Sequence, residues 1–129
     1  MVAVLDAWAV VAVLMGESAG PRVEETIAAG GAGASWISLG EAHYTLTRRR
    51  NASAADLGLR RVLTRLRAEE PDAALVTAAA RIKAGGSLSY ADCFVIATAQ
   101  RYGAPLLTGA PEIIDWAGDV EVIDLRTAG

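Results

Sequence analysis

Short apolar runs alternate with longer helical patterns along this chain, and this alternation limits the possible folds more than any other feature. Residues 2–5 are apolar and valine-rich, as in a strand buried on both faces. Residues 7–15 are too long and alanine-rich for a further strand and predict a helix. Further strands are expected at 34–37, 105–108 and 120–124, and further helices at 21–29, 39–50, 53–70, 71–83 and 89–102. The alternation predicts a three-layer α/β/α fold with a central parallel sheet.

The composition predicts a single cytoplasmic domain. A length of 129 residues suits one domain with one core, so we expect one domain over residues 1–129. With 53% hydrophobic and 21% charged residues, the chain is not intrinsically disordered. The net charge of −3 gives no overall attraction to nucleic acid, so such binding requires a local patch. The single cysteine excludes a disulfide framework, and no apolar run reaches the roughly 20 residues of a membrane span.

Three acidic residues each stand between an apolar run and the start of a helical pattern. They are Asp6, Glu41 and Asp92, and they are far apart in the sequence. A parallel sheet brings the carboxyl ends of its strands to one edge, where ligands commonly bind. Carboxylates that meet there suit a hard divalent cation, and such sites usually serve phosphate chemistry.

Helix capping is the alternative interpretation of the same three acids. Asp6 is suited to cap the helix at 7–15, and Ser38 with Glu41 and Ser89 with Asp92 match the Ser-x-x-acid capping box. For any one acid, capping is the better explanation. Three such acids on separate segments favour a shared site, and one carboxylate can serve both roles.

Three segments resemble PIN-domain proteins, and most closely the VapC-type toxin ribonucleases of toxin–antitoxin pairs. They are Val-Leu-Asp6-Ala-Trp-Ala-Val, Ile-Ser-Leu-Gly-Glu41 and Leu-Ser-Tyr-Ala-Asp92-Cys-Phe-Val-Ile-Ala-Thr-Ala. The resemblance spans essentially the whole chain. It implies an endoribonuclease that depends on Mg²⁺ or Mn²⁺, acts on tRNA, rRNA or mRNA, forms a homodimer and is inhibited by a cognate antitoxin protein. The family's catalytic, metal-binding acids correspond to Asp6, Glu41 and Asp92, with Asp6 and Asp92 as the first-choice direct ligands.

The fourth acid that the resemblance implies is absent. The family's Thr-Gly-Asp-Pro-Glu segment is Thr108-Gly-Ala110-Pro-Glu112 here, so alanine stands where the aspartate is expected. We do not assign Glu112 or Asp115 as ligands, because each is displaced along the chain. Ala110 is either a natural variant or a substitution that disarms a toxic protein, and the intact flanking motif favours the second. In both cases we expect weakened activity, with Thr108 at the rim of the site.

Arginines provide the candidate RNA contacts in this acidic protein. Arg48 and Arg49 end the helix expected at 39–50, and Arg61 lies on the next helix, so they could form a local basic clamp. A solvated face paired with nearby acids explains them equally well. His43 is placed nearly opposite Glu41 on the helix, which argues against a shared metal.

Two functions therefore remain open. The first is a metal-dependent ribonuclease toxin with activity weakened at Ala110. The alternative is a catalytically impaired PIN domain that binds RNA or an antitoxin.

Overall fold

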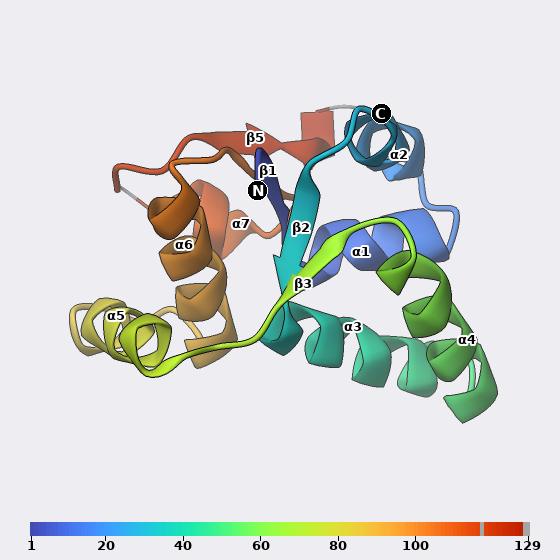
Figure 1. Cartoon of the computed structure of the whole chain (residues 1–129), viewed down its shortest axis with the longest axis horizontal. Coiled ribbons are helices and arrows are strands. Elements are labelled where there is room, and N and C mark those ends of the chain that lie inside the picture. The colour runs from blue at the N-terminus through green and yellow to red at the C-terminus, as the bar shows by residue number, and fades with distance from the viewer. Residues whose placement is uncertain (117, 128–129) are drawn as a thin grey trace.

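The computed structural model describes residues 1–116 and 118–127. In this part of the chain five strands form one sheet in the order β3-β2-β1-β4-β5, and each neighbouring pair is parallel (Figure 1). The strands are β1 (Ala3–Leu5), β2 (Ala32–Ser35), β3 (Arg67–Glu69), β4 (Leu106–Thr108) and β5 (Val122–Asp124). The predicted α/β fold with a central parallel sheet is confirmed.

Helices cover both faces of this sheet. Helices α1 to α4 lie mainly on one side and α5 to α7 on the other (Figure 1). They are α1 (Ala7–Leu14), α2 (Gly20–Ala28), α3 (Trp36–Arg49), α4 (Ala52–Leu63), α5 (Ala73–Ala84), α6 (Tyr90–Tyr102) and α7 (Pro111–Ile114), followed by a short 3₁₀ turn η1 (Leu125–Thr127). The predicted three layers are therefore present.

The alternation of side chains along β1 divides the core in two. Ala3 and Leu5 pack with apolar residues of α1 to α4, whereas Val4 packs with Val95 and Ile96 of α6. Successive strand residues point to opposite faces, so a strand between two helical layers has no polar position. This is why the sequence of β1 is apolar throughout.

The sheet changes direction between β1 and β4. From β1 the chain builds outward through β2 to β3, then returns through α5 and α6 to place β4 on the other side of β1. Leu5 is in register with Leu107, so the residues after both strands emerge side by side at the carboxyl edge. Such a switch point is where open α/β sheets bind ligands.

The predicted start of α3 was wrong by three residues. The run from Trp36 reads as strand because of its aromatic and β-branched residues, but the hydroxyl oxygen of Ser35 accepts from the Ile37 N–H over 3.2 Å and caps a helix there. The proposed capping box of Ser38 with Glu41 is therefore also wrong. Ser38 is buried inside the helix, and its hydroxyl has no hydrogen-bond partner in the part of the chain that the structure describes.

Besides η1, the strand β3 and the helix α7 were missed. The helix expected at 53–70 ends at Leu63, and Arg67–Glu69 forms the edge strand β3. Two of its three residues are charged, and an edge strand pairs on one side only, so no apolar run marks it. Helix α7 has only four residues, too few for a helical pattern. Among the described residues, no helix is both long and apolar enough to span a bilayer.

Candidate functional site

Asp6 follows β1 directly, and hydrogen bonds reach both of its carboxylate oxygens. The backbone N–H of Ala9 donates to Oδ1 over 2.9 Å, so Asp6 caps α1. The hydroxyl of Thr108, at the end of β4, donates to Oδ2 and itself accepts from the Ala110 N–H over 2.9 Å. Asp6 is only 4% exposed. A backbone N–H of α1 and a side chain of β4 therefore fix the orientation of this carboxylate.

Asp92 lies in the first turn of α6. The hydroxyl oxygen of Ser89 accepts from the Asp92 N–H over 3.1 Å and caps the helix, as the sequence predicted for Ser89. Ser89 also bonds to the Asp92 side chain, which opposes the rise in its pKa. Asp92 is 8% exposed. The helix dipole favours a negative charge at this position.

Glu41 comes from the second turn of α3 and contacts a tyrosine of the same helix. The Tyr44 hydroxyl donates to Oε2 of Glu41 over 3.5 Å. The guanidinium of Arg48 lies 4.9 Å from the centre of the Tyr44 ring. No role was predicted for Tyr44, because nothing in the sequence marks a contact one helical turn away as functional.

The three acids line one pocket. Its volume is about 200 Å³, and its wall also includes Ala110 and Glu112. Trp8 forms part of the wall as well, and its indole packs so closely on Gly109 that a Cβ at that position would collide with it. The structure thus brings Asp6, Glu41 and Asp92 together from β1, α3 and α6, with Thr108 bonded to Asp6.

The acids of the pocket destabilise one another as anions. Burial raises the pKa of Asp6 to about 7, and the charges of Asp92 and Glu41 add to the rise, while bonds from Thr108 and Ala9 oppose it. Burial also raises the pKa of Asp92, to about 6. The hydrogen bond with Ser89 opposes this rise, and the charges of Glu112 and Glu41 add to it. Burial raises the pKa of Glu41 too, against the bond from Tyr44, and the charge of Glu112 contributes.

Within the described residues, none of these acids forms an ion pair. A bound cation would relieve their repulsion, because it favours the charged form of each carboxylate.

The carboxylates are nevertheless spread around the pocket. Over residues 1–116 and 118–127, no three or more His, Cys, Asp or Glu side chains form a group that could hold a metal ion by themselves. The available donors are all oxygens, which suits Mg²⁺ or Mn²⁺. Mg²⁺ commonly binds through one or two carboxylates and keeps several waters. The donor set therefore fits a hydrated ion better than one enclosed by protein ligands.

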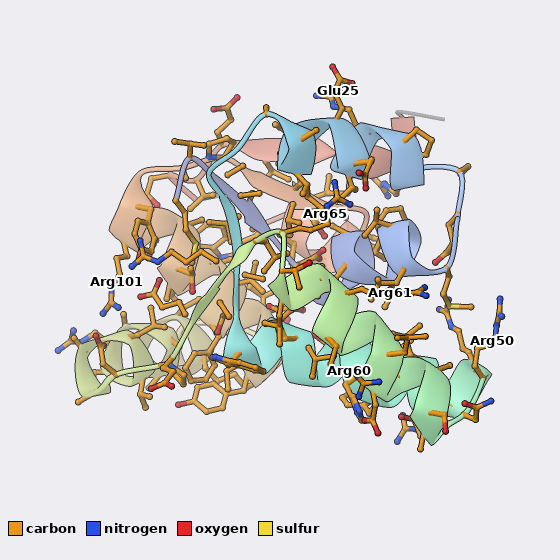
Figure 2. The ribbon with its side chains drawn as sticks, turned by 45° about the vertical axis from the view of Figure 1, so that its right-hand side comes forward. Glu25, Arg50, Arg60, Arg61, Arg65 and Arg101 are labelled. Atoms are coloured by element: carbon orange, nitrogen blue, oxygen red, sulfur yellow. The ribbon has the colours of Figure 1, made fainter. Side chains whose placement is uncertain are left out.

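The three arginines predicted to contact RNA lie in different places. Arg49 lines the carboxylate pocket and pairs with Glu17 over 3.5 Å. Arg48 packs on Tyr44. Arg61 lines a separate groove together with Arg60 and Arg65, and Arg65 pairs there with Glu24 of α2. Figure 2 shows Arg60 and Arg61 on α4, across the molecule from Arg101 on α6. Arg49 and Arg61 thus line different cavities.

His43 takes no part in the pocket. Its Nε2 lies 2.8 Å from Oδ1 of Asp56 on α4. Cys93 is buried in the cluster between α5 and α6, as expected for a structural thiol.

A family model of the PIN domain matches residues 3–113. Comparison with curated proteins by sequence gives no match. Among solved structures, the chain is similar to VapC20 of Mycobacterium tuberculosis, described as a toxin that cleaves the sarcin–ricin loop. The TM-score is 0.69 at 21% identity, over 98% of this chain and 95% of that one.

Two toxin–antitoxin structures are also similar. VapBC2 of Rickettsia felis, bound to a DNA fragment from its promoter, gives a TM-score of 0.75 at 17% identity, over 96% of this chain and 98% of that one. A toxin–antitoxin complex from Klebsiella pneumoniae gives 0.72 at 17% identity, over 95% and 97%. At these identities the structural likeness establishes the fold.

Proposed function

The chain belongs to the PIN-domain family, and from this premise we propose that it is a metal-dependent endoribonuclease toxin that a small antitoxin protein inhibits in the cytoplasm. One observation carries the proposal. Two buried carboxylates, Asp6 and Asp92, share a pocket with Glu41 at the switch point of the sheet, and no ion pair neutralises any of the three within the described residues. Perturbed carboxylates in such a cleft are typical of a functional site.

Asp6 and Asp92 are the residues that would hold the Mg²⁺ or Mn²⁺ ion, with Glu41 as a further ligand or a hydrogen-bond partner of bound water. When bound, such an ion lowers the pKa of water and offsets charge on the phosphodiester under attack. Thr108 keeps Asp6 from rotating, since its hydroxyl holds one oxygen while the Ala9 N–H holds the other. Tyr44 restrains Glu41 in the same manner, over a longer hydrogen bond.

The partners are part of the proposal. The similar proteins are an RNA-cleaving toxin and toxin–antitoxin complexes, which supports an RNA substrate and an antitoxin partner for this chain. Arg49 at the pocket wall is the best placed of the three arginines to contact an RNA backbone near the carboxylates. Homodimer formation is proposed from the family resemblance alone.

The test is cleavage of end-labelled RNA by the purified protein with Mn²⁺, with Mg²⁺ and with EDTA. We expect cleavage with either ion and none in EDTA. Asp92→Asn should lower the rate by at least about 100-fold, because even outer-shell changes at metal sites cost about 10- to 100-fold. Asp119→Asn, which alters an acid that accepts from Gln100, is the matched control and should cleave normally. Equal cleavage in EDTA, or by Asp92→Asn, would contradict the proposal.

The alternative is favoured by one observation, the alanine at position 110. A protein that binds RNA or an antitoxin but cleaves no RNA under any of these conditions would be the catalytically impaired module.

A further inference from the structure

Ala110 leaves the pocket one carboxylate short of the family pattern. It is the N-cap residue of α7, no side-chain hydrogen bond caps that helix, and its methyl group lines the pocket. Position 110 therefore contributes a backbone N–H to Thr108 but no oxygen ligand.

Helix α7 brings another acid to the same place. Ile113 is fully buried in the core with Val4, Val95 and Leu106, and it fixes this short helix against the sheet. Glu112, its exposed neighbour, lines the carboxylate pocket together with Asp6, Glu41 and Asp92. Glu112 also lines the adjoining groove, which Glu41 and Asp92 share. Its carboxylate thus lies where the two cavities meet.

Glu112 lies beside the predicted ligands. A side-chain hydrogen bond links Glu112 with Asp92, and Glu41 lines the same two cavities as these two acids. Glu112 therefore belongs to the carboxylate group and is not a distant surface charge.

The other nearby acids are less suitable. Glu17 lines the pocket but pairs with Arg49. Asp115 lines only the adjoining groove. Within the described residues Glu112 has no ion pair.

We propose that Glu112 supplies the fourth carboxylate around this pocket in place of residue 110, and that it binds a hydrated divalent cation there directly or through one of the bound waters. The proposal rests on the proposed function, because it concerns the same divalent-cation site. It makes Ala110 compatible with an active native protein: the longer glutamate, two residues along the chain, provides the oxygen that a shorter aspartate at 110 would otherwise provide.

The experiment compares the full-length protein with Glu112→Gln, Ala110→Asp, the double variant and Glu25→Gln. Glu25 is an exposed glutamate on α2, far from the pocket, and it controls for the loss of one charge (Figure 2). Mn²⁺ affinity is measured by titration calorimetry, and RNA cleavage is measured in parallel. Because Glu112 is exposed, its replacement should leave the fold intact, which the melting temperature in EDTA checks.

Glu112→Gln should weaken Mn²⁺ binding by about tenfold or more, whereas Glu25→Gln should bind like the parent protein. Adding Ala110→Asp to Glu112→Gln should restore the affinity to within a few-fold, since a carboxylate returns to the pocket. Unchanged Mn²⁺ affinity in Glu112→Gln, or no Mn²⁺ binding by the parent protein, would overturn the assignment.

The two readouts separate this proposal from the proposed function. If Glu112→Gln weakens Mn²⁺ binding but the parent cleaves no RNA, the assignment of Glu112 stands and the ribonuclease function fails. If the parent cleaves RNA and Glu112→Gln binds Mn²⁺ normally, the ribonuclease function stands and the assignment of Glu112 fails.

Discussion

The two ends of helix α6 each meet a group of carboxylates, but only one group contains its own cation. In the last turn of α6, Arg101 donates to Oε1 of Glu69 over 2.6 Å and to Oδ1 of Asp72 over 2.7 Å. In the first turn, Asp92 meets Asp6, Glu41 and Glu112 in a pocket where, among the described residues, none of the four forms an ion pair.

The pKa values follow from this difference. Hydrogen bonds from Arg101 and the Leu75 backbone lower the pKa of Asp72, and the two acids raise that of Arg101. At the other end, burial raises the pKa values of Asp6, Asp92 and Glu41. Arg101 of α6 neutralises Glu69 at the end of β3 and Asp72 at the start of α5, so this group joins three elements and serves stability. The pocket group is incomplete, which is the condition expected of a site that binds a cation from solution.

The largest expected effect is the pH dependence of stability without metal. The pKa of Asp6 rises from 3.8 to about 7 on folding, and that of Asp92 from 3.8 to about 6. The folded protein therefore holds protons that the unfolded chain has released, and stability should fall as pH rises from about 4 to about 7, then level off. The total fall is on the order of a few kcal/mol.

Melting temperatures in EDTA between pH 5 and 8 measure this effect. Asp6→Asn should flatten the curve and melt higher than the parent at pH 8, because asparagine can keep the cap on α1 without a buried charge. Mn²⁺ at pH 8 should stabilise the parent and not Asp6→Asn. A parent melting temperature that rises with pH over this range would show that the pocket acids are already neutralised, and the contrast between the two groups would be lost.

Removing the cation at the other end should have a smaller effect of a different kind. Arg101→Met keeps much of the side-chain length but removes the counter-ion of Glu69, whose carboxylate is nearly buried. We expect a loss of about 1–2 kcal/mol, reduced by water because Arg101 is 28% exposed. Denaturant unfolding at pH 7 measures it, and RNA cleavage should be unchanged. Asp72→Asn is the milder comparison, since asparagine still caps α5. If Arg101→Met cleaved RNA more slowly than the parent but were equally stable, the Arg101 group would instead belong to the active site.

The sequence was sufficient for those parts of the fold and site that depend on local patterns. The strands β1 and β4 are unbroken apolar runs, and the helix at Tyr90–Tyr102 begins at the Ser89 cap and ends at Gly103, so their positions were predicted closely. Asp6 was interpreted both as a cap and as a site residue because it directly follows a strand. The cap is confirmed, and its role as a ligand stays a prediction.

What the sequence did not predict depends on contacts between distant segments. Strand β3 exists because β2 offers it a pairing edge, not because Arg67–Glu69 is apolar. Glu112 was not predicted as a ligand, because it lies two residues beyond the position where the family motif has its fourth acid. In the folded protein α7 nevertheless brings Glu112 to the wall of the pocket. Arg48, Arg49 and Arg61 looked equivalent in the sequence, and only the packing of α3 against α1 and α4 separates their surroundings.

Arg49 is the residue that could blur the contrast between the two ends of α6. It lines the carboxylate pocket, yet its ion pair is with Glu17, so we expect it to contact RNA and not to neutralise the site acids. Arg49→Ala should weaken RNA binding a few-fold and lower the salt slope of log K by about 0.7–0.9, the effect of one phosphate contact. Arg61→Ala removes the same charge from the separate groove and should weaken binding less.

Both variants should melt like the parent in EDTA. If Arg49→Ala alone lost stability at pH 8 and left RNA binding unchanged, Arg49 would be the counter-ion of the pocket, and the carboxylates at both ends of α6 would be neutralised from within the protein.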